Sequence, residues 1–124
     1  MGKLCGFLFC ILLASPSIAL SHASLVKSVP ARRAQIFKSP AQIQLWFNER
    51  LEARFSSLRV IDSNGKRVDL GNVEVSTDDP KRISVGVNPL APGQYKIRFR
   101  VLSVDGHVVE DEVPFTIRDP QRAL

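Results

Sequence analysis

Alternation between apolar and polar residues is the feature of this sequence that most restricts its fold. In QIQLWF (residues 42–47) and QYKIRFRV (residues 94–101) every second side chain is large and apolar, and basic residues fill most alternate positions of the second run. Successive side chains of a β-strand point to opposite faces, so the pattern predicts strands with one buried and one solvated face. Strands of this kind pack as two facing layers.

Shorter runs of similar character predict further strands. They cover residues 25–29, 58–61, 67–70, 82–87 and 113–118. Turn signals such as SNG (residues 63–65) and PG (residues 92–93) separate them, and only residues 30–36 leave room for a helical turn or two. These observations predict an all-β Greek-key sandwich or barrel.

The first 21 residues have the three parts of a secretory signal. Lys3 supplies a basic start, residues 4–14 are apolar, and a polar tail containing a proline follows. The apolar run is shorter than the about 20 residues that a membrane span requires. We therefore expect removal of residues 1–21, although small residues also allow a cut after Ala23. Residues 22–124 then form one small domain without either cysteine.

Composition and motifs argue against several functional classes. The formal net charge is +5 and the basic residues are dispersed, which is typical of solvated faces and not of a nucleic-acid footprint. The sequence has no glycine-rich phosphate loop and no Gly-x-Ser-x-Gly motif. We interpret the acidic pair at residues 78–79 as a turn and the acidic run at residues 110–112 as a solvated strand edge. The chain is therefore not expected to be an enzyme.

The segment SVDGH (residues 103–107) contains one of the two histidines. In an extended segment, side chains two residues apart point to the same side, about 6 to 7 Å apart. Asp105 and His107 could therefore bind one ion between them. The alternative is that Asp-Gly forms a common hairpin turn, followed by an exposed histidine.

The second histidine stands at the expected start of the mature chain. If cleavage leaves His22 first, that residue offers both a free α-amine and an imidazole. The amine has an ordinary pKa of about 7.7 to 8.0, so a metal can displace its proton near neutral pH. With Asp105 and His107 the donor set becomes three nitrogens and one oxygen. Tetragonal sites of this composition favour Cu(II) over zinc, calcium or magnesium.

Three segments carry a resemblance to a known family: HASLVKSVP from residue 22, QIQLWFNERLEARFSSLRV, and LAPGQYKIRFRVLSVDGHVVEDEVPFTI. Together they resemble the CopC family of periplasmic copper-binding proteins. The resemblance implies a seven-stranded Greek-key β-barrel that holds one Cu(II) through His22, Asp105 and His107. It implies that Glu49 lies close by, as an axial ligand or just outside the ligands, and that cleavage precedes His22.

The same resemblance implies a function in copper sequestration, trafficking or resistance in the periplasm. A CopD-type transporter of the inner membrane is the implied partner, and we expect a monomer without a membrane span after cleavage. Met1 is the only methionine, so no soft ligand remains for a Cu(I) site. Two alternatives stay open: a copper oxidase or monooxygenase built on the same histidine arrangement, and a metal-free β-sandwich that serves as a binding module.

Overall fold

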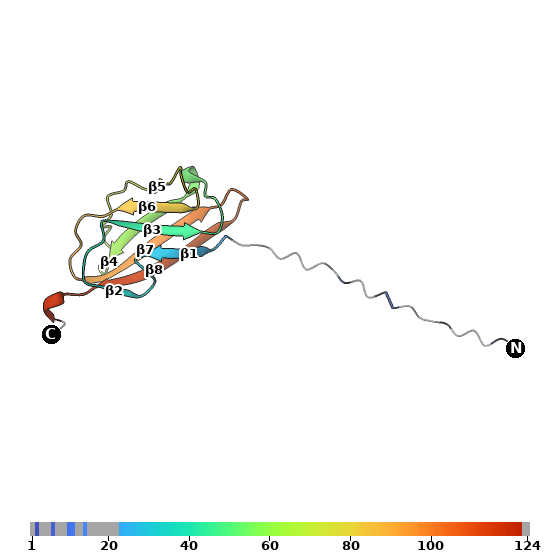
Figure 1. Cartoon of the computed structure of the whole chain (residues 1–124), viewed down its shortest axis with the longest axis horizontal. Helices are drawn as coiled ribbons and strands as arrows, with labels where there is room; N and C mark the ends of the chain where they lie inside the picture. The colour runs from blue at the N-terminus through green and yellow to red at the C-terminus, as the bar shows by residue number, and fades with distance from the viewer. Residues whose placement is uncertain (1, 3–5, 7–9, 12–13, 15–22, 123–124) are drawn as a thin grey trace.

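The computed structural model describes residues 2, 6, 10, 11, 14 and 23–122. Two four-stranded sheets, with strand orders β1-β3-β6-β5 and β2-β8-β7-β4, pack face to face (Figure 1). The elements are β1 (Leu25–Val29), β2 (Ala34–Ile36), β3 (Gln42–Phe47), the 3-10 helix η1 (Ala53–Phe55), β4 (Ser57–Asp62), β5 (Glu74–Val75), β6 (Arg82–Gly86), β7 (Gly93–Leu102), β8 (Val108–Ile117) and the 3-10 helix η2 (Pro120–Arg122). No helix in this part of the chain is both long and apolar enough to cross a membrane.

The predicted all-β Greek-key sandwich is confirmed, and its core follows the alternation in the sequence. On β3 and β7 the apolar positions are buried, and the rings of Phe47 and Phe99 meet edge to face across the two sheets at 5.4 Å between centroids. Each large apolar side chain that leaves water contributes about 1.5 to 3 kcal/mol. The buried core residues run from Ala23 to Ile117. Among the described residues, the core thus lies entirely within residues 23–122.

The strands differ from the expected ones in two places. Residues 30–36, which left room for a helical turn or two, instead contain β2, which pairs in parallel with the end of β8. The described residues form eight strands, whereas the resemblance implies seven. The count depends on two very short strands, β2 with three residues and β5 with two. Strand β8 begins at Val108 and includes the acidic run at residues 110–112, whose pairing with β7 outweighs its poor strand propensity.

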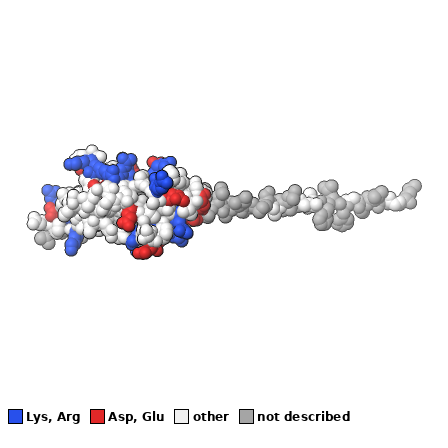
Figure 2. Space-filling model, turned by 90° about the horizontal axis from the view of Figure 1, so that it is seen from above, with Lys and Arg blue, Asp and Glu red and all other residues white. Residues whose placement is uncertain are grey.

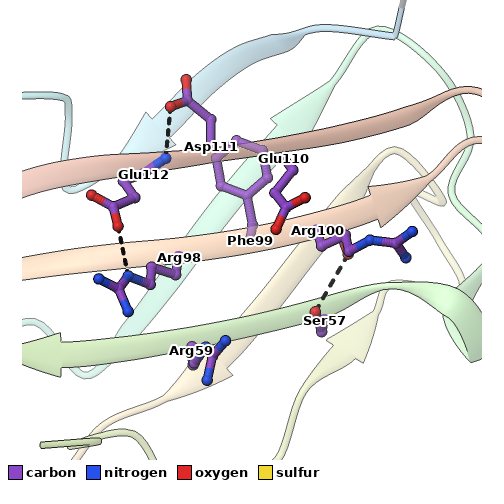
Figure 3. Close-up of a pocket in the computed structure, with 8 residues that line it drawn as sticks. All are labelled: Ser57, Arg59, Arg98, Phe99, Arg100, Glu110, Asp111 and Glu112. Atoms are coloured by element: carbon purple, nitrogen blue, oxygen red, sulfur yellow. Dashed lines mark hydrogen bonds and ion pairs between the residues drawn. The ribbon is translucent and has the colours of Figure 1, made fainter. Parts of the chain in front are cut away.

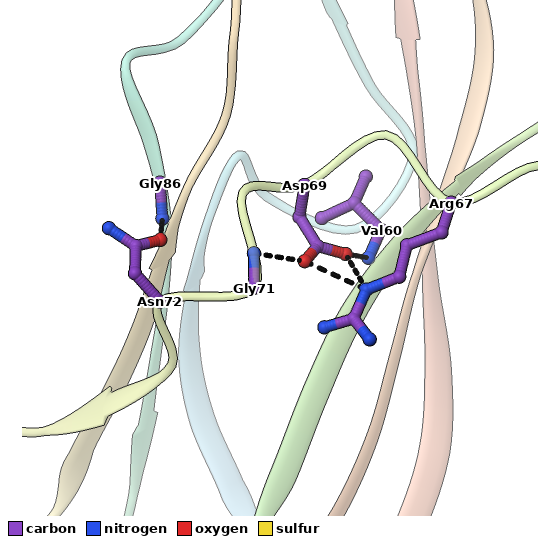
Figure 4. A network of polar contacts seen from close by, with 6 residues as sticks. All are labelled: Val60, Arg67, Asp69, Gly71, Asn72 and Gly86. Carbon is purple, nitrogen blue, oxygen red and sulfur yellow. Dashed lines mark hydrogen bonds and ion pairs between the residues drawn. The ribbon is translucent and has the colours of Figure 1, made fainter.

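The predicted strand at residues 67–70 is also wrong. This segment makes only isolated bridges to Ile61 and Val87. The carboxylate of Asp69, whose side chain is 0% exposed, accepts hydrogen bonds from the backbone N–H groups of Val60 (2.8 Å) and Gly71 (2.8 Å) (Figure 4). Side-chain bonds thus replace a strand ladder here.

Candidate metal centre

Three segments far apart in the sequence meet at one end of the sandwich. They are the residues that precede β1, the residues that follow β3, and the turn between β7 and β8. Figure 1 shows the start of β1 at the same end as the β7–β8 turn. This end contains Asp105 and His107, which lie close together, and Glu49, which does not form a three-residue metal-binding group with them.

A buried serine fixes the turn between β7 and β8. The N–H of Ser103 donates to the carbonyl of His107 (2.9 Å), the hydroxyl of Ser103 accepts from the N–H of His107 (3.1 Å), and the carbonyl of Ser103 accepts from Gly106 (2.9 Å). Gly106 has φ +87°, a left-handed conformation that favours glycine. The Asp-Gly sequence thus forms a turn, as one of the two alternatives expected, and the turn also orients the flanking side chains.

Asp105 and His107 lie close together on this turn. Asp105 Oδ2 is 3.6 Å from His107 Nδ1, and the two side chains are 42% and 35% exposed. A hydrogen bond from the Ser103 side chain lowers the pKa of Asp105 below its ordinary value, and the neighbouring His107 adds a smaller lowering. The carboxylate is therefore ionised at neutral pH and reachable from solvent, as a ligand for a cation must be.

Glu49 follows β3 on a segment that runs beside the same turn. The carbonyl of Arg50 accepts a hydrogen bond from the N–H of Val104 (2.9 Å), and Leu51 forms an antiparallel bridge with Ser103. Glu49 lies two residues before Leu51, and Asp105 lies two residues after Ser103, so both residues are close in sequence to this bridge. Glu49 is half-buried. Its position is compatible with a contact at the edge of a site built on Asp105 and His107.

The start of the described chain is anchored beside Glu49. Asn48 accepts a hydrogen bond from the N–H of Ser24 through its side-chain oxygen (2.7 Å), and its own N–H donates to the carbonyl of Ser24 (3.1 Å). Ala23 is buried, with 5% exposure. His22 itself lies outside the described residues. The described chain therefore begins, at Ala23, beside the segment that carries Glu49.

The described part of the chain contains no group of three or more His, Cys, Asp and Glu side chains that could hold a metal ion. Asp105 and His107 supply one oxygen and one nitrogen, which leaves the α-amine and imidazole of His22 to complete the predicted set. Ser103 and Asn48 position the site, although the sequence did not assign either of them a role. The available signal for Ser103 was a serine two residues before Asp-Gly, whereas the contact of Asn48 with Ser24 forms only in the folded chain.

Fold and site together define a small β-sandwich with a histidine–carboxylate pair at one end. The sequence model of the CopC domain matches residues 25–118. The chain belongs to the CopC family. Its relatives include the copper transport protein CutJ of Bacillus subtilis, 34% identical over 103 residues, and protein YobA of Escherichia coli K12, 30% identical over 107 residues. The matches cover 82% and 86% of this chain, but 19% of CutJ and 86% of YobA.

Two solved structures share the fold. CopC from Methylosinus trichosporium OB3b superposes with a TM-score of 0.74 at 34% identity, covering 80% of this chain and 96% of that one. PcoC, a methionine-rich copper resistance protein from Escherichia coli, superposes with a TM-score of 0.68 at 28% identity, covering 79% and 100%. The described sandwich therefore corresponds to nearly the whole of each of these two structures.

Proposed function

We propose that this chain is an exported copper-handling protein that binds one Cu(II) at the end of its sandwich. The ligands are the α-amine and imidazole of His22, the carboxylate of Asp105 and the imidazole of His107, with Glu49 beside them. The observation that carries this proposal is the pairing of Asp105 with His107, 3.6 Å apart, on the end where the chain after His22 is anchored. Relatives named for copper transport and copper resistance support the choice of metal.

The donor set suits Cu(II) for reasons of charge and geometry. Three nitrogens and one oxygen match the tetragonal preference of Cu(II), which also binds such ligands more tightly than other divalent ions of its row. Asp105 offers its negative charge without needing to lose a proton at neutral pH, because its pKa is lowered. The turn held by Ser103 keeps both ligand side chains on one short segment, so little ordering is required on binding.

The half-exposed ligands favour a carrier. A copper ion held at the surface of the sandwich can exchange with a partner without unfolding the core. We propose that the partner is a CopD-type transporter of the inner membrane, that the protein is a monomer, and that copper sequestration, trafficking or resistance is its role. Binding without turnover agrees with the names of the relatives, and we assign no catalytic step.

Export and metal binding are coupled in this proposal. Residues 1–21 act as a signal peptide and residues 22–124 form the periplasmic copper-binding domain. Before cleavage the nitrogen of His22 belongs to a peptide bond, where its lone pair is delocalised. The complete site therefore forms only after removal of the signal.

The test compares a chain that begins at His22 with one that carries Gly-Ser before His22. The extension keeps every side chain and moves only the amine. We expect the extended form to bind Cu(II) about 100-fold or more weakly and to give a different electron paramagnetic resonance spectrum, with the same thermal stability in the absence of copper. Equal affinities and equal spectra would exclude the amine as a ligand.

The oxidation state is tested separately. The chain from His22 onward has no methionine or cysteine, so a competition titration with a Cu(I) chelator should show much weaker binding than the Cu(II) titration. A tight Cu(I) site that survives replacement of both histidines would contradict the proposed preference.

A further inference from the structure

Four basic side chains lie next to one another on the outer face of the sheet β2-β8-β7-β4. Lys96, Arg98 and Arg100 occupy alternate positions of β7, and Arg59 lies on the neighbouring strand β4, directly opposite Arg98 in the antiparallel register. All four are exposed. We refer to these four residues as the basic stripe. In Figure 2, Lys and Arg side chains gather along one long side of the sandwich.

The basic stripe is unfavourable for the sheet itself. Like charges directly opposite each other across an antiparallel pair weaken the pairing, and Arg59 faces Arg98 in this way. Glu112 relieves part of the repulsion, since its carboxylate lies 2.6 Å from Arg98 Nε and 3.9 Å from Lys96 Nζ. Within residues 23–122, no ion pair involves the guanidinium group of Arg59 or Arg100. In the antiparallel register Arg100 lies opposite Glu110 of β8, whereas Arg59 lies opposite Arg98. The stability of the fold therefore does not account for Arg59.

The arginines of the basic stripe line a shallow hollow on this face. Figure 3 shows Arg59, Arg98 and Arg100 around it, with the carboxylates of Glu110 and Glu112 on β8 along one side. Ser57 on β4 also lines the hollow, in register with Arg100 of β7. The hollow thus presents guanidinium groups on β4 and β7, and its carboxylates lie only on β8.

We infer that the basic stripe binds an acidic, extended segment of a partner protein. Alternate residues of an extended chain are about 6.6 to 6.8 Å apart, which is also the spacing of Lys96, Arg98 and Arg100 along β7. Carboxylates at alternate positions of the segment can therefore each meet one cation. An arginine fork binds a carboxylate through two parallel hydrogen bonds, which adds geometric selectivity. The inference goes beyond the proposed function, because it needs no metal.

A narrow segment fits this face better than an anionic membrane does. Glu110 and Glu112 run beside the stripe on β8 and would repel a broad negative surface. One extended segment over β4 and β7 is repelled less, although it competes with Glu112 for Arg98 and Lys96. The stripe also leads toward the candidate metal centre, since Arg100 precedes the turn at residues 103–107 on the same strand. A partner docked here is therefore held next to the end that we propose carries copper.

The experiment uses the chain from His22 onward, which contains the whole core. The probe is an alternating Glu-Ser peptide of ten residues with blocked ends, and an alternating Gln-Ser peptide is its uncharged control. Amide chemical shifts are followed by NMR at low and at physiological salt. We expect the Glu-Ser peptide to shift amides of β4 and β7 around the basic stripe, with affinity falling as salt rises, and the Gln-Ser peptide to shift none.

Two double variants separate a site from general charge attraction. Arg59→Gln with Arg100→Gln removes two charges from the stripe, and Lys38→Gln with Arg122→Gln removes two exposed charges elsewhere. We expect about tenfold weaker peptide binding for the first pair and no change for the second, because two charge-assisted contacts are lost only in the first. The Cu(II) affinity of both double variants should equal that of the parent. If the peptide does not bind, the proposed copper-binding function is therefore unaffected.

Four results would overturn the inference. The shifts could spread over all basic residues, or both double variants could weaken binding equally, which would mean non-specific attraction. The Arg59→Gln, Arg100→Gln chain could bind the peptide normally but self-associate, which would assign the arginines to protection of the β4 edge. Binding to phosphatidylglycerol vesicles that depends on the stripe, without peptide binding, would assign the face to a membrane.

Discussion

Asp69 and Asp105 show how the same side chain serves two different purposes in one small protein. Both stand in loops whose shape depends on hydrogen bonds between side chains and backbone. The side chain of Asp69 is 0% exposed, and its oxygens accept hydrogen bonds from the N–H groups of Val60 and Gly71 and from the Nε of Arg67 (2.9 Å) (Figure 4). Asp105 is 42% exposed, and the backbone bonds of its loop are made by Ser103 instead.

The difference teaches how to distinguish a structural carboxylate from a candidate ligand. A carboxylate whose lone pairs all meet donors of its own fold stabilises that fold and has nothing left for a cation. A carboxylate can bind an ion when it is ionised and exposed and when a neighbouring residue makes the hydrogen bonds that hold its loop. The comparison predicts that changes at Asp69 affect folding alone and changes on the turn at residues 103–107 affect copper first.

The largest effect is expected for His107→Ala. The variant loses one nitrogen ligand of the proposed site, so Cu(II) affinity should fall about 100-fold or more, beyond the effect of a residue that only supports a ligand. Thermal unfolding without copper should be nearly unchanged, because the side chain is not part of the core. Isothermal titration with a competing chelator measures the affinity, and Glu49→Ala, with a much smaller loss, is the matched variant. Parent-like affinity for His107→Ala would refute the assignment.

Asp69→Ala is expected to have the largest effect on folding. The buried N–H of Val60 loses its acceptor, at about 1 to 3 kcal/mol, and the exposed N–H of Gly71 loses a bond worth about 0.5 to 1.5 kcal/mol. The free energy of unfolding should therefore fall by roughly 2 to 4 kcal/mol. Urea unfolding measures the change. Asp78→Ala, at an exposed turn position, is the control and should stay within about 0.5 kcal/mol of the parent. Cu(II) binding by folded Asp69→Ala protein should match that of the parent. A large loss of Cu(II) affinity would show that Asp69 is not purely structural.

Ser103→Ala tests whether the serine frees Asp105 for binding. The buried hydroxyl orients the turn, so its loss should weaken Cu(II) binding about 10-fold, within the range for residues that orient ligands. Unfolding free energy should fall by about 1 kcal/mol. Ser57→Ala, at an exposed position on β4, is the control for removal of a hydroxyl. Unchanged affinity and stability in Ser103→Ala would mean that the backbone alone holds the turn.

The same variant has a pH signature. The pKa of Asp105 is lowered in the folded chain, so its contribution to stability is present above the unfolded pKa of about 3.9 and is lost as the pH falls through the lower folded value. Carbon-detected NMR titration of the carboxyl group should show the pKa of Asp105 rising toward its ordinary value in Ser103→Ala. An unmoved titration would mean that the smaller causes, the backbone hydrogen bond to the Asp105 carboxylate and the neighbouring His107, account for the lowering.

The smallest effect is expected for Arg59→Thr. Removing one of two arginines that face each other across β4 and β7 should raise the free energy of unfolding by about 0.2 to 1 kcal/mol. Urea unfolding at low salt measures it, and the gain should shrink at high salt because screening weakens the repulsion. A loss of stability would show that the arginine stem contributes packing that outweighs the repulsion.

Much of the fold could be predicted because its strands depend on local alternation. Strand β3 was predicted at its observed bounds, and β7 extends the predicted strand by one residue at each end. The failures have tertiary causes. Strand β2 exists because the end of β8 offers a free edge to Ala34–Ile36, and residues 67–70 are not a strand because the buried Asp69 carboxylate takes the place of a ladder. Neither partner is visible from spacing within the segment.

The candidate site divides in the same way. The sequence by itself determined the residue types and the pairing of Asp105 with His107, because two residues on one short segment cannot move far apart. Only the tertiary structure decided that Glu49 and the start of β1 reach that turn, through the bonds of Asn48 to Ser24 and of Arg50 to Val104. Long-range contacts of this kind depend on how two sheets stack and align, which no local pattern encodes. The same reason hid the basic stripe, since Arg59 and Arg98 face each other only once β4 and β7 pair.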